Sequence, residues 1–397
     1  MNPHIKKLAE IADSKSRVIV GLMSGTSLDG LDVVLCRFNN SGTDTEMELL
    51  HFKTLSYTED FKKELKSISF KSQVDLQKVT LLNAFIGTYH AELILQCLQE
   101  WNFNAQNVDL IASHGQTIFH APISLHHLSR YGNSTLQIGD GDHIAVKTGI
   151  ITISDFRQKH IAAGGEGAPL AVYGDFLIFS SLTENRILLN IGGISNFTYL
   201  PAGKDQQHVF STDVGPGNTL MDQFVQSRYP GTHYDEDAQL SSKGVINESL
   251  LNELLGNDFF KLPFPKTTGP ELFSLAYLND ALSKVNASNL SNEDILATLC
   301  EFTARTIHDA ISASIKQESY EIYMSGGGMH NPLLTKRLGS LLKLDLKDTR
   351  ELNVHPDAKE AVLFALLANE CTAGGEFGFK GRPGMPSVLM GKISLPA

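Results

Sequence analysis

Short apolar runs rich in β-branched residues alternate along this chain with longer stretches of helical periodicity. Residues 17–38 and 186–200 share one pattern, in which an apolar run, a turn of small residues and a second apolar run follow one another. This pattern is typical of a β-hairpin whose backbone makes a close approach at its tip. Because the hairpins begin about 170 residues apart, they predict two related halves.

The rest of the pattern divides between further strands and helices. Apolar runs predict strands over 46–57, 108–117 and 149–156, and a strand, glycine turn and helix over 322–342. Helices are expected over 1–15, 59–70, 75–101, 219–228, 241–255, 270–285, 291–316 and 357–371, with a turn followed by a helix over 135–149.

The alternation of strands and helices predicts an α/β fold. The glycine-rich segment 162–181 is expected to be a linker and crossing helix between two doubly wound lobes with a cleft between them. We therefore expect the first lobe over residues 1–160, with 371–397 packed on it, and the second lobe over 161–370.

Charge and composition exclude several classes of protein. The chain has 33 basic and 44 acidic residues, a net charge of −11 and no basic cluster, which argues against binding to nucleic acid or an anionic membrane. No apolar run reaches the roughly 18 residues of a spanning helix, and the charged N-terminal stretch is unlike a leader peptide. Four cysteines without C-x-x-C spacing are typical of reduced core residues, so a cytoplasmic protein is expected.

Common catalytic motifs are missing from the sequence. It contains no Walker A loop, no H-E-x-x-H, no G-x-S-x-G and no G-x-G-x-x-G after a strand, and its 14 histidines form no metal-binding pattern. Small-residue turns follow several predicted strands instead, at 24–30, 192–196, 213–218 and 325–328. Their amides and hydroxyls would suit phosphate, although any single turn could equally be tight without a ligand.

Eleven blocks of the sequence resemble the anhydro-N-acetylmuramic acid kinases, a family of the actin, sugar kinase and heat-shock ATPase superfamily. Ordered blocks of up to twelve residues are far more specific than one glycine motif. The blocks are GLMSGTSLDGLD (21–32), SHGQT (113–117), LQIGDGDHIA (136–145), DFR (155–157), GGEGAPL (164–170), LNIGGISNF (189–197), DVGPGN (213–218), YDEDA (234–238), PKTTG (265–269), GGGMHNPLL (326–334) and AKEAVLFALLA (358–368).

The resemblance implies two actin-like, ribonuclease H-like lobes with a nucleotide and sugar cleft between them. It also implies an ATP- and Mg²⁺-dependent kinase of peptidoglycan recycling. In that family's reaction, water opens the internal ring of 1,6-anhydro-N-acetylmuramic acid while the 6-oxygen takes the γ-phosphoryl group. The products are N-acetylmuramic acid 6-phosphate and ADP, and such a site needs a carboxylate base and a phosphate clamp.

By resemblance, Asp213 of the DVGPGN block is the base that takes a proton from the water. An aspartate is ionised at neutral pH and needs only correct placement for this role. Its position before G-P-G-N would also suit a helix N-cap or an Asx turn. Glu360 matches the family's second carboxylate near the water, and is otherwise a first-turn glutamate favoured by the helix dipole.

The nucleotide is expected at the glycine-rich turns. By resemblance, Asp29 would hold Mg²⁺ through water, or else it caps the turn. The first hairpin matches the family's ATP-binding hairpin at Gly25, Thr26, Ser27, Leu28, Asp29, Gly30, Leu31 and Asp32. Further contacts with phosphate and adenosine are expected from Gly192, Gly193, Gly326, Gly327 and Gly328.

The sugar is expected to contact two further blocks. By resemblance, Arg157 is suited to bind the lactyl carboxylate of the substrate, because a guanidinium pairs well with a carboxylate. For His114 and Asp155, buried structural hydrogen bonding is the alternative. The residues that face the sugar by resemblance are His114, Gln116, Thr117, Asp155 and Arg157.

Some positions depart from the family pattern. Glu166 stands where the family usually has glutamine and Pro270 where it has arginine, so contacts from these two positions are not carried over. Residues 1–16 match none of the eleven blocks. Two other functions stay open, a superfamily kinase for another carbohydrate and a nucleotide-switched actin-like scaffold. The expected partners are a sugar and ATP, without nucleic acid or membrane. A homodimer is compatible with the sequence, which does not give the oligomeric state.

Overall fold

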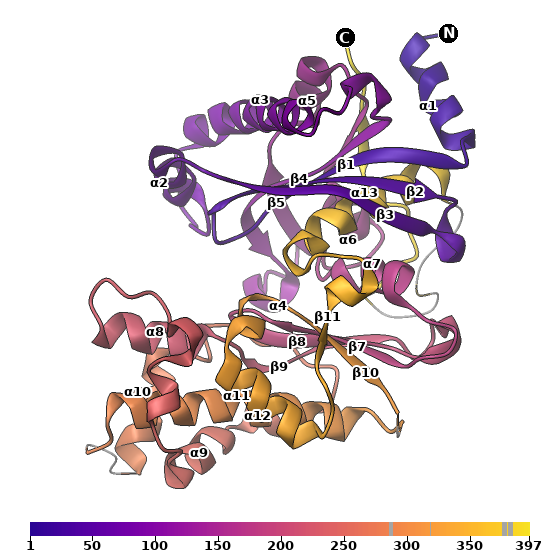
Figure 1. The fold of residues 1–397 in the computed structure, drawn as a ribbon. Helices are drawn as coiled ribbons and strands as arrows, with labels where there is room; N and C mark the ends of the chain where they lie inside the picture. The colour runs from indigo at the N-terminus through magenta and orange to yellow at the C-terminus, as the bar shows by residue number, and fades with distance from the viewer. Residues whose placement is uncertain (286–288, 318, 375–378, 380–383) are drawn as a thin grey trace. The chain divides into compact units, whose positions relative to one another are not determined.

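The computed structural model describes residues 1–285, 289–317, 319–374, 379 and 384–397 (Figure 1). The chain forms two compact units, Met1–Ile178 with Asn353–Ala397 and Phe179–Leu352. These bounds differ from the expected lobes, because 161–178 and 353–370 belong to the first unit. No helix in the described ranges is both long enough and apolar enough to cross a membrane.

The first unit is built on a mixed sheet with the strand order β12-β6-β4-β1-β2-β3, in which β5 also pairs with β4. Strands β1, β2 and β3 are antiparallel neighbours, whereas β4 is parallel to both β1 and β6. The strands are β1 (Ser16–Ser24), β2 (Gly30–Asn39), β3 (Glu46–Ser56), β4 (Leu110–Ala121), β5 (Ser134–Ile138), β6 (Thr152–Ser154) and β12 (Lys392–Ser394).

Helix α13 explains why the unit boundary differs from the expected one. Its residues 361–370 are all buried. Gly21 of β1 lies so close to it that a Cβ at that position would stand 2.2 Å from the carbonyl oxygen of Ala361. The helices of this unit are α1 (Pro3–Asp13), α2 (Glu59–Ile68), α3 (Leu76–Glu100), α4 (Ile123–His126), α5 (Gly141–Thr148), α6 (Phe156–Ala162), α7 (Ala171–Phe179, which ends at the boundary) and α13 (Lys359–Ala373).

The second unit has a five-stranded sheet with the order β11-β10-β7-β8-β9. Strands β7, β8 and β9 are antiparallel neighbours, and β10 is parallel to both β7 and β11. The elements are β7 (Arg186–Ile191), β8 (Ile194–Leu200), β9 (Phe210–Pro216), β10 (Glu321–Ser325), β11 (Lys347–Asp348), α8 (Thr219–Arg228), α9 (Glu248–Leu255), α10 (Leu275–Lys284), α11 (Asn292–Ser314) and α12 (Pro332–Leu342).

The two sheets repeat one topology. Each has three antiparallel strands in sequence order, with the first of them followed on its other side by two parallel strands. This is the ribonuclease H-like arrangement expected of an actin-like lobe. The expected α/β class and the two related halves are therefore confirmed, and the hairpins 17–38 and 186–200 are the first two strands of the two sheets.

Some expected elements differ in detail. The segment 135–149, expected to be a turn and helix, begins with the edge strand β5 before α5. Its alternating exposure suits an edge strand, in which one face stays in solvent. Helix α9 starts at Glu248 instead of 241, because 241–243 form a single 3₁₀ turn.

A buried carboxylate ties α11 to α12 in the second unit. Glu301 is 1% exposed, and its two oxygens accept hydrogen bonds from Arg305 Nε at 2.9 Å and Arg337 Nε at 2.6 Å. Burial raises the pKa of Glu301 and is the largest single effect, but the hydrogen bonds and positive charges of the two arginines together outweigh it, so the net direction is downward. The ionised form therefore stabilises the folded state.

We expect Glu301→Gln to lower the free energy of unfolding by about 1–3 kcal/mol at neutral pH, since one arginine loses its acceptor. A lowered folded-state pKa contributes stability above the unfolded pKa, and this is lost as pH falls through the folded pKa. The difference from the parent chain in urea unfolding should thus shrink in acid. Asp258→Asn, which removes an exposed ion pair with Lys261, is the matched control and should change stability by less than about 0.5 kcal/mol.

Candidate active site

The tip of the first hairpin presents its small polar residues to solvent. Thr26, Ser27 and Asp29 are exposed, whereas Leu28 is buried and holds the turn at a positive φ of 62°. In the described part of the chain, the amides of Gly25, Thr26 and Ser27 have no protein acceptor. Free amides beside exposed hydroxyls form the kind of concave nest that binds phosphate.

A chain of buried hydrogen bonds lies under this tip. Tyr57 OH lies 2.8 Å from His90 Nε2 and 2.9 Å from Ser24 Oγ, which lies 2.6 Å from Gln116 Oε1. Gln116 Nε2 then donates to the carbonyl oxygen of Gly25 at 3.2 Å. Burial lowers the pKa of His90 to about 3, so the ring is neutral, and an Nε2–H would start the chain as a donor to Tyr57.

The network includes contacts of Gln116 with the first hairpin that the sequence did not predict. A contact of Gln116 with the sugar stays a prediction; the residue is 1% exposed, and its side chain contacts Ser24 and the carbonyl oxygen of Gly25. Its neighbour Thr117 accepts a hydrogen bond from Gln137 Nε2 at 3.1 Å. Tyr57 and His90 were missed altogether, because they come from β3's end and α3, outside the recognised blocks.

His114 and Arg157, both expected to face the sugar, are in direct contact. Arg157 Nε donates to His114 Nε2 at 3.0 Å, and Arg157 Nη1 donates to the Gly167 carbonyl oxygen at 2.7 Å. Burial lowers the pKa of Arg157, and the negative charge of Glu360 opposes this shift. Glu360 is an exposed residue in the first turn of α13, and desolvation by the protein around its carboxyl group raises its pKa.

Asp155 has a strained backbone. It precedes α6 with φ 54° and ψ 45°, a left-handed conformation that is unusual for a residue with a side chain. It sits at the helix N-cap position, but its side chain makes no cap hydrogen bond and its carboxylate pairs with Lys392 instead. Strain of this kind clusters at functional sites. The two positions that depart from the family pattern, Glu166 and Pro270, are both exposed.

Asp213, the expected base, lies near the end of β9 in the second unit. Thr268 N donates to Asp213 Oδ2 at 2.9 Å, and Asp213 N donates to the Lys266 carbonyl oxygen at 3.0 Å. Burial raises the pKa of the Asp213 carboxyl, the Thr268 amide opposes this, and the charge of Glu271 adds to it. The carboxylate is therefore held in place by a donor and made more basic than an exposed aspartate.

Three glycine turns of the second unit converge. Gly217 N donates to the Gly193 carbonyl oxygen at 2.8 Å, and a Cβ on Gly217 would stand 2.2 Å from the Gly192 oxygen. A Cβ on Gly328 would stand 2.2 Å from Ile191 Cγ2 and 3.0 Å from Asn218 Oδ1. The amides of Gly192 and Gly193 have no acceptor in the described chain. The turn after Asp213 and the turn after β10 thus both meet the tip of the second hairpin.

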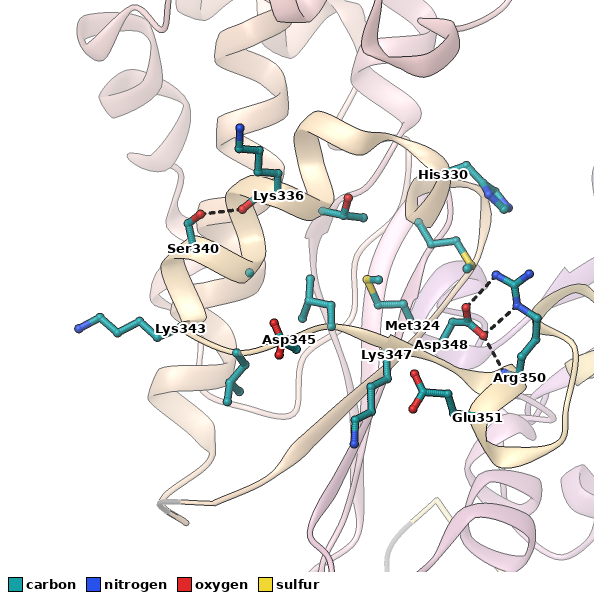
Figure 2. A pocket seen from close by; sticks show the side chains of 15 residues that line it. Met324, His330, Lys336, Ser340, Lys343, Asp345, Lys347, Asp348, Arg350 and Glu351 are labelled. Carbon is teal, nitrogen blue, oxygen red and sulfur yellow. Dashed lines mark hydrogen bonds and ion pairs between the residues drawn. The ribbon is translucent and has the colours of Figure 1, made fainter.

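A cavity of about 780 Å³ lies between α12 and the β11 region, next to the turn 326–328 (Figure 2). Figure 2 shows Arg350 paired with Asp348, to which its Nε donates at 3.0 Å. Met324 and Met329 are the lining residues that flank the turn in sequence. The 15 lining residues include no Phe, Tyr or Trp, and the planar groups among them are the His330 ring and the Arg350 guanidinium.

The metal expected with ATP is compatible with this arrangement. The described residues contain no cluster of three or more His, Cys, Asp or Glu side chains that could hold a metal ion. Mg²⁺ keeps several waters and binds mainly through substrate phosphates with one or two carboxylates, for which the exposed Asp29 is suitable. The donor set therefore fits a metal that arrives with the nucleotide.

A ribonuclease H-like strand order repeated in two sheets, with amides at both hairpin tips that have no acceptor in the described chain, places the protein in the actin-like class of folds. Residues 17–374 match the family model described as anhydro-N-acetylmuramic acid kinase. The chain belongs to this family and is an enzyme of it.

Relatives from several bacteria agree along the full length. Anhydro-N-acetylmuramic acid kinases from Pseudoalteromonas atlantica and Pseudoalteromonas translucida are 55% and 52% identical to this chain, covering 100% and 99% of both partners. The one from Caldanaerobacter subterraneus is 37% identical, over 98% of this chain and 100% of its own. A solved activator of 2-hydroxyisocaproyl-CoA dehydratase from Clostridium difficile aligns with a TM-score of 0.44, 12% identity and coverage of 89% and 94%, which adds nothing to the strand order described above.

Proposed function

We propose that this kinase opens the 1,6-anhydro bridge of 1,6-anhydro-N-acetylmuramic acid with water and phosphorylates the 6-oxygen, as a step in peptidoglycan recycling. The observation that carries the proposal is the half-buried Asp213 carboxylate, fixed by the Thr268 amide beside the converging glycine turns. A placed base is what the attacking water needs. ATP supplies the phosphoryl group, and Mg²⁺ bound to it would neutralise phosphate charge.

In the proposed step, Asp213 takes a proton from water and the water oxygen bonds to the anomeric carbon. The bond from that carbon to the 6-oxygen breaks, and the 6-oxygen takes the γ-phosphoryl group of ATP, releasing ADP. Free amides at the hairpin tips would stabilise the transferring phosphoryl charge. Arg157, whose orientation is fixed by His114 and Gly167, would bind the lactyl carboxylate.

The test is phosphoryl transfer to the anhydro sugar in ¹⁸O-labelled water, followed by mass spectrometry. We expect a product that carries one phosphate and one ¹⁸O at the anomeric oxygen, because the 6-oxygen is free only after ring opening. As a control, preformed N-acetylmuramic acid 6-phosphate is incubated in the same labelled water, which measures how much ¹⁸O enters the anomeric position by exchange after the reaction. A chain that turns over another sugar instead, or that hydrolyses ATP slowly without response to any sugar, would contradict the proposal.

The pH dependence of kcat/KM offers a second check. Asp213 must be ionised to accept the proton, so activity should fall as pH drops through its pKa. Because burial raises that pKa, the acid limb should lie above the ordinary aspartate value of about 3.9. A profile that stays flat down to that value would exclude Asp213 as the titrating base.

A further inference from the structure

Lys266 has a buried ammonium group with no carboxylate partner among the described residues. The residue is 9% exposed, and its Nζ donates to the carbonyl oxygens of Phe259 at 3.0 Å and Phe260 at 3.4 Å. The same atom lies 4.5 Å from the ring centres of both Phe259 and Phe264. Lys266 is thus held by two carbonyls and two aromatic faces, an arrangement in which a cation is attracted to the rings.

Such a group is costly for a purely packing role. Burial lowers the pKa of Lys266, which means that the surroundings disfavour its charge. An apolar side chain of similar length would fill the same space without the desolvation of an ammonium. The charge therefore serves something that packing alone does not require.

The backbone of Lys266 is bonded to Asp213 and its neighbour. The Lys266 carbonyl oxygen accepts from Asp213 N at 3.0 Å, and Lys266 N donates to Thr212 Oγ1 at 3.0 Å. Two residues further on, Thr268 N donates to the Asp213 carboxylate. The segment 266–268 thus fixes both the main chain and the side chain of Asp213.

We propose that Lys266 is a positioning residue for Asp213, whose anchored ammonium keeps the segment 266–268 in register and the Thr268 amide on the carboxylate. The inference rests on the proposed function in that Asp213 is the base. Lys266 would act on Asp213 through the backbone hydrogen bonds of the segment 266–268. Its own ammonium group contacts carbonyl oxygens and aromatic rings and pairs with no carboxylate in the described chain.

The consequence appears in the titration of Asp213. The Thr268 amide opposes the rise that burial imposes on the Asp213 pKa. Once the segment is no longer anchored, this opposition weakens and the pKa rises further. The carboxylate is then protonated over a wider range of pH, so turnover is lost most strongly in acid.

The kinetic test compares Lys266→Met with the parent chain from acid to alkaline pH. Methionine retains the apolar stem among the rings but removes the three N–H donors. We expect kcat to fall by about tenfold at alkaline pH and by more in acid, with KM for ATP within about twofold. Lys261→Met is the matched control, at an exposed lysine in the 3₁₀ turn Asp258–Lys261, which also holds Phe259 and Phe260. An equal loss at every pH, or no loss, would overturn the inference.

An activity-independent measurement separates this inference from the proposed function. Carboxyl ¹³C shifts of labelled aspartates, with Asp213 assigned through Asp213→Asn, report the Asp213 pKa in a protein without substrate. A higher pKa of Asp213 in Lys266→Met supports the inference even if the protein does not turn over the anhydro sugar. An unchanged pKa of Asp213 contradicts the inference even if the protein does turn over that sugar. If Lys266→Met does not fold, Phe264→Leu removes one of the two nearest rings and should shift the pKa in the same direction.

Discussion

Asp213→Asn should lower kcat for the anhydro sugar by about 10²–10⁴-fold, which is the usual contribution of a placed general base. Asparagine retains the shape of the side chain and can still accept the Thr268 amide through its oxygen, but it cannot take the proton from water. Affinity for ATP and the thermal unfolding temperature should stay close to those of the parent chain. Steady-state kinetics, nucleotide titration and circular dichroism measure these three quantities.

Asp222→Asn provides a matched control for Asp213→Asn. Asp222 lies in the first turn of α8 in the same unit, and burial raises its pKa to about 6. It has no part in the proposed chemistry, so turnover should change little. Full turnover in Asp213→Asn, or an equal loss in both variants, would remove Asp213 from the role of base.

Gly217→Ala should weaken ATP binding and turnover by about 10²-fold, which corresponds to a loss of roughly 2.7 kcal/mol in binding free energy. The added Cβ would stand 2.2 Å from the Gly192 carbonyl oxygen. Because that oxygen belongs to the backbone, no side-chain rotation can relieve the clash. The turn after Asp213 must then move away from the tip of the second hairpin. Isothermal titration calorimetry with ATP measures the loss of binding, and the kinetics of phosphoryl transfer measure the loss of turnover.

Gly132→Ala controls for the general effect of replacing glycine. No atom lies within 4 Å of a Cβ at that position, and its φ needs no glycine. It should bind ATP as the parent chain does. If Gly217→Ala also keeps its ATP affinity within about twofold while folding normally, the convergence of the turns is not needed for nucleotide binding.

Local sequence patterns predicted much of the fold. The two hairpins, α3 and α11 were predicted because their apolar spacing is local and long. The unit boundary was not, because α13 belongs with β1 through the contact at Gly21 and Ala361, which are 340 positions apart in the chain. Edge strands such as β5 and β12 are short and half exposed, so their patterns carry little signal.

The candidate site divides in the same way. Asp213 and the glycine turns lie in contiguous blocks, and the sequence could predict them together. The contacts of Gln116 with Ser24 and Gly25 could not be predicted, because these residues are about 90 positions away in the chain, and its contact with the sugar stays a prediction. The role of Lys266 depends on rings supplied by neighbouring turns, and only three-dimensional contacts reveal it.

The division of the chain has a consequence for its synthesis on the ribosome. The second unit is one continuous stretch, Phe179–Leu352, whereas the first is completed only by Asn353–Ala397. Every residue of the second unit is therefore made before α13 can cover β1. The second unit can fold during translation, while the face of the first sheet that α13 covers stays open until residues 359–373 have emerged.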